Sequence, residues 1–220
     1  MSEPLVSAII VTAGARGHIY SCLDAVRQQS LLPLEIIVID NSQNQDLKSE
    51  LNRSYPLAKV YSSEENKFYC NALDIGIKMS KGDFILCLND DVILDKDFLA
   101  RALKGFTIDN QNGMLSGKIL RRNKKIIDST GLFLSPWRTA KERGYSQFDR
   151  GQFDTEGYVF GVSGAAALYR REMLEDIKVA EEYFDSDFRF YYEDLDIAWR
   201  AQNRGWKGYY MPSAIAYHVR

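Results

Sequence analysis

The chain has 220 residues, which is enough for one substantial domain or two small ones. It contains 45% hydrophobic and 26% charged residues, as soluble globular proteins do, and its formal net charge of −2 gives no indication of nucleic-acid binding. The longest apolar runs are too short to span a bilayer and the N-terminus lacks the features of a signal peptide, so any membrane association is expected to be peripheral.

Strand and helix signals alternate through the first half of the chain. Apolar, β-branched runs predict buried strands at residues 5–11, 34–39, 57–61 and 84–88. Apolar residues at helical spacing predict helices that include residues 19–26, 72–79 and 98–106. Because strands that alternate with helices usually pair in parallel, this half is predicted to be a parallel sheet with helices on both faces.

The second half is less regular. A helix begins near Glu193, with Leu195, Ala198 and Trp199 along its apolar side. Strand signals without clear intervening helices lie at residues 114–120, 126–134, 158–169, 208–211 and 214–218.

Residues 136–153 are polar and aromatic, and they are predicted to form a long loop of the kind that is usually functional or disordered. Its cations are suited to meet phosphate or polar groups of a ligand, so we expect the loop to be mobile alone and to order over bound ligand. These cations are Arg138, Lys141, Arg143 and Arg150.

The three cysteines lack the spacing of a metal site or of a redox pair. Cys22, Cys70 and Cys87 each lie among apolar neighbours. We therefore expect reduced core thiols in a cytoplasmic protein.

Two adjacent carboxylates, Asp90 and Asp91, follow the strand predicted at residues 84–88. Ligands of open α/β sheets bind beyond the carboxyl ends of the strands, so this pair lies where a site belongs. A hard cation such as Mg2+ or Mn2+ that also holds a diphosphate would relieve the repulsion between them. Taken alone, the pair is explained more simply as a solvated acidic turn that caps the next helix. Asp40 ends an earlier strand and is either a nucleotide contact or an ordinary turn residue.

Further candidates lie late in the chain. Glu193 and Asp194 open the last predicted helix, where acids either interact with the helix dipole or supply a general base. His218 is either an ordinary packed histidine or a nitrogen ligand to a metal, which would favour Mn2+. The small residues at 161–166 let the backbone approach a ligand or pack tightly in a strand. The chain lacks the glycine patterns of dehydrogenases and P-loop proteins.

The order of these motifs is more specific than any single one. The segments LEIIVIDNS, NALDIGIKMSKGDFILCLNDDV, FGVSGAAALYRREMLED, FRFYYEDLDIAWRAQNRGW and MPSAIAYH follow one another along the chain. This succession resembles the family 2 glycosyltransferases, and among them the bacterial rhamnosyltransferase-like branch that builds surface polysaccharides. The resemblance implies a single domain of the α/β, A-type fold. In it a Rossmann-like, nucleotide-sugar-binding half (1–92) is fused to a mixed β-sheet, acceptor-binding and catalytic half (93–220).

The resemblance also implies a reaction and its partners. A sugar would move with inversion from a nucleotide-diphosphate donor, a UDP- or dTDP-sugar, to a glycan or lipid-linked glycan, with Mn2+ or Mg2+ as cofactor. Asp91 and His218 match the metal ligands, and Asp194, with Glu193 beside it, matches the catalytic base. The positions that match donor-binding residues are Asp40, Thr12, Asn71, Asp90 and Gly164.

The chain departs from the family pattern in two places. The turn at residues 12–16 lacks the common Pro-Thr-Tyr-Asn sequence, which leaves the contacts to the nucleotide base open. Family members usually continue beyond the position of His218, which leaves room for acceptor-binding or membrane-associating elements past residue 220, at the inner face of the membrane.

Two other functions remain to be weighed. A sugar-1-phosphate nucleotidyltransferase shares the architecture and the metal, but its glycine-rich early loop is only faintly echoed at residues 13–17. A non-catalytic carbohydrate- or nucleotide-binding module would have no need of Asp91, Asp194 and His218 together.

Overall fold

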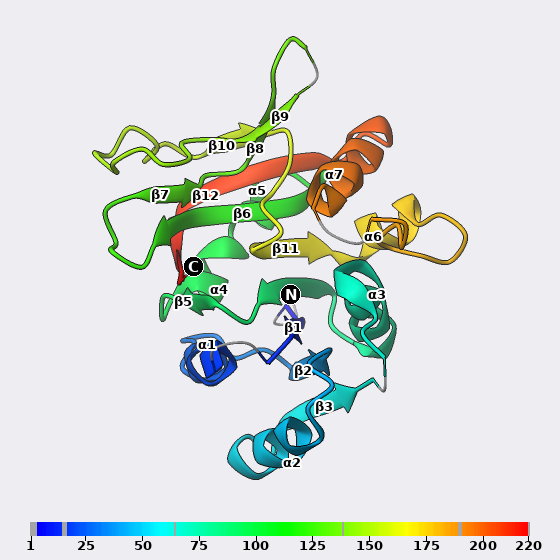
Figure 1. Ribbon diagram of the computed structural model, residues 1–220. Helices are drawn as coiled ribbons and strands as arrows, with labels where there is room; N and C mark the ends of the chain where they lie inside the picture. Colours follow the sequence, from blue (N-terminus) through cyan, green and yellow to red (C-terminus); the bar gives the residue numbers. More distant parts are fainter. Residues whose placement is uncertain (1–3, 15–16, 64, 138, 189–190, 220) are drawn as a thin grey trace.

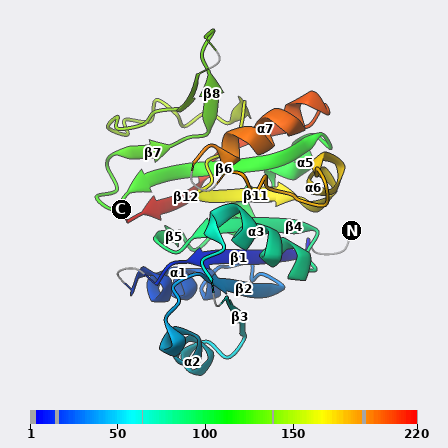
Figure 2. The ribbon, with the colours of Figure 1, turned by 45° about the vertical axis from the view of Figure 1, so that its right-hand side comes forward.

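A large mixed β-sheet runs through the molecule, and helices cover both of its faces (Figure 1). The structure is a computed structural model that describes residues 4–14, 17–63, 65–137, 139–188 and 191–219. Within these residues the main sheet has ten strands, eight of them in the order β10-β12-β6-β11-β4-β1-β2-β3, with β5 on β12 and β7 on β6. A separate ribbon of two strands, β8 and β9, projects beyond the β10 end of the sheet (Figures 1 and 2).

The strands divide into a parallel part and a mixed part. β1 to β4 pair in parallel, whereas β11 pairs antiparallel with both β4 and β6 and so joins the two parts into one sheet. The strands are β1 (Val6–Thr12), β2 (Glu35–Asp40), β3 (Ala58–Ser62), β4 (Phe84–Asn89), β5 (Val92–Leu94), β6 (Asn112–Arg121), β7 (Ile127–Ser129), β8 (Leu132–Leu134), β9 (Ala140–Glu142), β10 (Gly157–Val159), β11 (Ala166–Arg170) and β12 (Lys207–His218).

Two apolar clusters, one on each face of the sheet, hold the helices in place. The helices α1, α2, α4 and α5 contribute to one cluster, and α3, α6 and α7 contribute to the other. Because both faces are covered, the central strands β1 and β2 are buried along their whole length. The helices are α1 (His18–Arg27), α2 (Gln45–Ser54), α3 (Phe68–Met79), α4 (Phe98–Ala102), α5 (Gly105–Ile108), α6 (Arg171–Ile177) and α7 (Glu193–Asn203).

The alternating pattern expected for the first half is confirmed, with two differences. α2 was not predicted because it is mostly polar and buries mainly Leu47 and Leu51. The helix expected at residues 98–106 is divided into α4 and α5 by a turn at residues 103–104. At Gly105 the backbone approaches β6 so closely that a Cβ atom would lie 2.0 Å from Leu115 Cδ1, which a continuous regular pattern does not anticipate.

The second half differs more from the sequence prediction. Gly131, with φ of 101°, separates β7 from β8, where one strand was expected. Residues 160–165 separate β10 from β11, and α6 follows β11 where no helix was predicted. The two last predicted strands are one, β12, with an irregularity between Met211 and Ile215. These breaks depend on packing across the sheet, which periodicity along the chain does not report.

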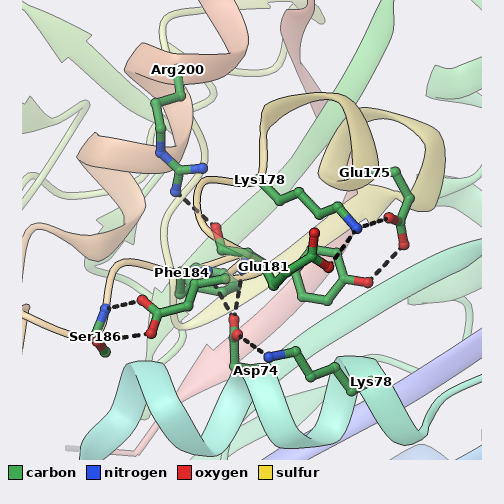
Figure 3. A network of polar contacts seen from close by, with 10 residues as sticks. Asp74, Lys78, Glu175, Lys178, Glu181, Phe184, Ser186 and Arg200 are labelled. Carbon is green, nitrogen blue, oxygen red and sulfur yellow. Dashed lines mark hydrogen bonds and ion pairs between the residues drawn. The ribbon is translucent and has the colours of Figure 1, made fainter.

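A polar network fixes the segment that leads into α7 (Figure 3). On α3, the buried Asp74 accepts hydrogen bonds of 2.9 Å from the backbone N–H groups of Tyr183 and Phe184, and Lys78 Nζ lies 3.2 Å from its other oxygen. From α7, Arg200 donates to the carbonyl oxygen of Tyr183 at 2.8 Å. The segment is therefore tied to both helices between which it passes.

The structure also bears on two expectations from composition. Cys22, Cys70 and Cys87 are free and buried, as predicted. Among the described residues, no helix is long and apolar enough to cross a membrane.

Candidate active site

A cavity of about 670 Å3 opens at the carboxyl ends of β1 and β4, opposite the start of α7. This is the edge at which ligands of open α/β sheets bind. Its lining comes from both halves of the chain: Val11, Ala13, Asn41, Asn66, Phe68, Tyr69, Asn89, Asp90, Asp91, Glu142, Ser163, Gly164, Ala165, Tyr191, Glu193, Asp194 and His218.

Asp90 and Asp91 lie on one wall, where β4 ends. The buried Thr12 hydroxyl donates a hydrogen bond to Asp90 Oδ2 at 2.5 Å and accepts one from the N–H of Gly14. Thr12 therefore lies behind Asp90 and orients it. Burial raises the pKa of Asp90, and the nearby Asp91 carboxylate adds to this against the lowering effect of Thr12.

His218, at the end of β12, faces Asp91. Its Nε2 lies 3.1 Å from Asp91 Oδ1, and its Nδ1 lies 2.7 Å from Oδ2 of the buried Asp128. Burial by itself would lower the pKa of His218, but hydrogen bonds and charge from Asp128 and Asp91 raise it to about 9. His218 in turn lowers the pKa of Asp91, although burial opposes this.

This pair fits a divalent cation. Metal-bound histidines commonly ligate through one ring nitrogen while the other contacts a carboxylate, and Asp128 takes that second place on His218. A carboxylate oxygen and an imidazole nitrogen lie side by side on the cavity wall. Within the described part of the chain, no group of three or more His, Cys, Asp or Glu side chains could hold a metal.

On the opposite wall, Asp194 is held by two backbone N–H groups. Oδ2 accepts from Gly164 at 3.2 Å, and Oδ1 accepts from Leu195 at 2.8 Å. Burial raises the pKa of Asp194 in spite of these bonds. Its neighbour Glu193 has a pKa raised to about 7 by burial and by the Asp194 charge, and its buried Oε2 has no hydrogen-bond partner among the described residues.

The remaining acid of this helix has a structural role. Asp196 forms a two-pronged ion pair with Arg200, with Oδ2 at 2.9 and 2.7 Å from Nε and Nη2. Asp194 therefore lines the cavity, whereas Asp196 pairs with Arg200. The buried face of α7 differs from the sequence prediction, because Ile197, Ala198 and Ala201 form it. Leu195 and Trp199 are only half-buried.

Three expected donor-binding residues, Thr12, Asp40 and Asn71, do not line the cavity. Asp40 is 1% exposed, and its oxygens accept hydrogen bonds from the Ser42 N–H and the Ser62 hydroxyl. Asn71 is half-buried on α3, whereas Asn66, Phe68 and Tyr69 of the preceding turn line the cavity. Donor contacts by Thr12, Asp40 and Asn71 stay predictions. Asn41, the neighbour of Asp40 in the chain, does line the cavity.

The stretch at residues 136–153 contains more structure than the expected loop. It contributes β9, which pairs with β8. Arg143 is fixed rather than available to a ligand, since it donates to Thr130 and its guanidinium lies 4.5 Å from the centre of the Tyr210 ring. Lys141 and Arg150 are exposed. Arg138 lies outside the described residues, and the ordering of this stretch by ligand stays a prediction.

Sequence reasoning missed Glu142. It lies at the end of β9 and lines the cavity beside Asp194. Burial, with a contribution from the Asp194 charge, raises its pKa to about 7 against the hydrogen bonds from Ser129 and Ser163. A single glutamate in a polar stretch matches no sequence motif. Its place in the site is visible only in the fold, which brings the end of β9 and the start of α7 to the same cavity.

Comparison with known proteins identifies the family. The model of "Glycosyl transferase family 2" matches residues 7–178. The chain belongs to glycosyl transferase family 2. The match contains Asp90, Asp91 and Gly164, so this family membership, expected from the motif order, covers residues on both walls of the cavity.

Curated relatives of this family 2 chain include bacterial synthases. Poly-beta-1,6-N-acetyl-D-glucosamine synthases of Staphylococcus aureus strains are 27% identical over 188 residues, and that of Staphylococcus epidermidis is 23% identical over 186. The matches cover 83% of this chain and 42% of each relative, so the chain spans less than half the length of these relatives. Neither is named as a rhamnosyltransferase, and that finer branch stays a prediction.

Solved structures of similar shape include three transferases. GalNAc-T7 with UDP, GalNAc and Mn2+ has a TM-score of 0.80 at 15% identity, over 100% of this chain and 45% of that one. The Pyrobaculum calidifontis mannosyltransferase PcManGT with GDP-Man and Mn2+ has a TM-score of 0.70 at 19% identity, and the match covers 98% of this chain and 57% of that one. TarS of S. aureus has a TM-score of 0.71 at 17% identity, and the match covers 98% of this chain and 37% of that one. These likenesses confirm the predicted A-type α/β fold.

Proposed function

We propose that the chain is an inverting glycosyltransferase, which moves a sugar from a nucleotide-diphosphate donor to an acceptor hydroxyl during synthesis of a bacterial surface polysaccharide. The observation that carries the proposal is that a single cavity has the Asp91–His218 pair on one wall and Asp194 on another. Membership of family 2 supports the reaction class, and the similarity to poly-beta-1,6-N-acetyl-D-glucosamine synthases supports a polysaccharide product.

Asp91 and His218 would hold a divalent cation, with Asp128 fixing the histidine ring behind them. When bound, the cation neutralises the charge that the leaving diphosphate gains. The imidazole nitrogen favours Mn2+ over Mg2+. Two proteins of similar fold were solved with Mn2+, which supports a divalent metal here.

The donor would lie between the two walls. Asp90, oriented by Thr12, is suited to hydroxyls of the donor, and Gly164 leaves room for its sugar. A Cβ at residue 164 would approach Glu193 Oε1 to 3.2 Å and fill part of that space. We propose a UDP- or dTDP-linked hexose or deoxyhexose, rhamnose included.

Asp194 is the proposed general base. Its carboxylate takes the proton of the acceptor hydroxyl as that oxygen attacks the anomeric carbon and the bond from this carbon to the diphosphate oxygen breaks. The N–H groups of Gly164 and Leu195 hold the carboxylate in place, while burial keeps its pKa raised and so makes it a stronger base. Glu193 would bind a sugar hydroxyl through its unpartnered buried oxygen.

Binding and slow hydrolysis of a panel of UDP-, dTDP- and GDP-sugars, each with Mn2+, Mg2+ or EDTA, would test this function. We expect at least one donor to be hydrolysed with metal and not with EDTA. Pyrophosphate release from a nucleoside triphosphate and a sugar phosphate would instead identify a nucleotidyltransferase. Binding of the donor without any turnover would identify a binding module.

We also propose that the acceptor is a glycan, carried on a lipid at the cytoplasmic face of a membrane. The polysaccharide synthases to which the chain is similar support the glycan part. Flotation of the protein with vesicles of bacterial lipids, with and without a lipid-linked glycan, would measure the membrane association.

A further inference from the structure

A second cavity, of about 680 Å3, lies against the first one at the N-terminus of α7. Glu142, Tyr191 and Asp194 line both cavities and so mark the boundary between them. Asp90, Asp91 and His218 belong to the first cavity. If the donor diphosphate occupies the side of these residues, an acceptor must reach Asp194 from the other side. The second cavity provides that approach.

The walls of the second cavity suit a sugar ring. They carry exposed aromatic side chains from β8, from the turn after β9 and from the turn before α7, with exposed fractions between 40% and 79%. Aromatic faces pack against the C–H face of a sugar, and a few placed polar groups bind its hydroxyls. The aromatic residues are Phe133, Tyr145, Tyr191 and Tyr192, and the polar ones include Glu142, Lys141 and Gln147.

Glu142 is held rigidly at the boundary. The Ser163 hydroxyl donates to Oε1 at 2.9 Å, and the Ser129 hydroxyl donates to Oε2. The two serines come from separate segments, the end of β7 and the turn before β11. Each carboxylate oxygen can accept more than one hydrogen bond, so a ligand hydroxyl can still be bound.

Glu142 also has no cation beside it. Among the described residues, several other acids form ion pairs with a Lys or Arg side chain, but Glu142 forms none. A largely buried carboxylate without a cation is costly, and groups of this kind are kept mainly where a ligand uses them. The charge of Asp194 adds to that cost.

We propose that Glu142 binds the acceptor. Its carboxylate accepts a hydrogen bond from one hydroxyl of a sugar that lies in the second cavity against the aromatic residues, and thereby presents a neighbouring hydroxyl to Asp194. This inference rests on the proposed function. It adds to that function the place where the glycan acceptor binds and a residue that selects it.

The alternative is that Glu142 only ties β9 to the neighbouring segments. A matched control is Glu35, another buried glutamate, which accepts hydrogen bonds from a serine hydroxyl and the Lys81 N–H and pairs with Lys59 at the far end of the sheet. Glu35→Gln makes the same substitution as Glu142→Gln, at a position that lines neither cavity. A purely structural role would make the two variants behave alike.

The test compares Glu142→Gln with Glu35→Gln in two assays. The first is saturation-transfer NMR with methyl glycosides of glucose, galactose, N-acetylglucosamine and rhamnose. The second is the ratio of transfer to these glycosides over hydrolysis of the donor by water. We expect Glu142→Gln to weaken glycoside binding at least tenfold and to lower that ratio at least tenfold. Glu35→Gln should change the melting temperature only.

Three results would overturn the proposal: no glycoside binding to the wild-type protein, unchanged glycoside binding in Glu142→Gln, or equal losses in Glu142→Gln and Glu35→Gln. The binding assay needs neither donor nor metal. Failure of donor hydrolysis would thus count against the proposed function, whereas failure of glycoside binding counts against this inference alone.

Discussion

At the residue scale, the site depends on a few carboxylates whose surroundings give them different roles. Asp194 and Asp196 are two positions apart on α7, yet one is held by backbone N–H groups at the cavity and the other by a guanidinium. Asp91 is stabilised in its charged form by His218, whereas burial raises the pKa of Asp90 beside it. The same residue type thus supplies the proposed base, a structural anchor and a proposed metal ligand.

Asp194→Asn is expected to lower transfer by at least ~10²-fold while the affinity for the donor changes little, because the base acts on the acceptor proton in the transition state. For the wild type, the acid limb of the pH–rate profile should lie above the ordinary range of an aspartate, since burial raises the pKa of Asp194. Steady-state kinetics and nucleotide calorimetry measure both effects. A folded, fully active Asp194→Asn protein would refute the mechanism.

Asp196→Asn provides the comparison within the same helix. Loss of its ion pair with Arg200 should cost about 1.5–3 kcal/mol of stability, as hydrogen bonds to charged groups do. Its effect on the rate should be much smaller than that of Asp194→Asn. Urea unfolding of both variants separates the two contributions.

His218 should make the stability of the metal-free protein dependent on pH. Its pKa is raised from the ordinary 6.5 to about 9, so the folded state binds this proton more tightly than the unfolded chain does. The stabilisation is complete below pH 6.5 and is lost as pH rises through about 9. We expect the free energy of unfolding of the wild type, relative to His218→Gln, to fall by roughly 2–3 kcal/mol across this window. Urea titrations in EDTA measure it, and a constant difference would contradict it.

At the scale of elements, α7 is placed by the segment before it as much as by its own packing. Tyr191 and Tyr192 have φ of 66° and 69°, in the left-handed region that bulky residues seldom adopt. Such strain persists where surrounding contacts impose it. The Asp74 network holds residues 183 and 184, which precede these tyrosines in the chain (Figure 3).

Asp74→Ala is expected to destabilise the protein by roughly 2–4 kcal/mol, since two buried N–H groups and a cation lose their partner. Hydrogen exchange at residues 183 and 184 should become faster. Lys78→Ala is the control, and because its side chain is 52% exposed it should cost less than about 1 kcal/mol. Equal losses in both variants would mean that the network does not anchor this segment.

At the scale of the whole molecule, the two halves meet through β4 and β11, and the cavity lies across this junction. A ligand that bridges both walls should therefore stabilise the entire domain. The strands of both halves belong to one continuous sheet (Figures 1 and 2).

UDP with Mn2+ is expected to raise the melting temperature by roughly 5–10 °C at a hundred times the dissociation constant. At that concentration, binding to the folded state adds ~2.7 kcal/mol to the free energy of unfolding. Each kcal/mol raises the melting temperature of a domain of this size by ~2–4 °C. EDTA and Asp91→Asn should each remove most of the shift, because uncompensated carboxylates repel the diphosphate. Scanning calorimetry with UDP, dTDP and GDP measures this effect. An equal shift in EDTA would rule out the metal site.

Several features of this protein follow from local patterns in its sequence. The βαβ order of the first half follows from apolar periodicity, and this periodicity is sufficient to put Asp90 and Asp91 at the end of a strand. The division of roles between Asp194 and Asp196 follows from their spacing on a helix. The order of the motifs was sufficient for the family.

Which polar residues share a cavity depends on the tertiary structure. Asp128, which lies behind His218, is 90 residues away from it in the chain. Glu142, which lies between the two cavities, is 21 residues away from its partner Ser163. The tertiary structure also placed Asp40 beneath the cavity surface. The physical reason is that strand breaks, close backbone approaches and buried charges depend on neighbours across the sheet, which periodicity along one segment does not contain.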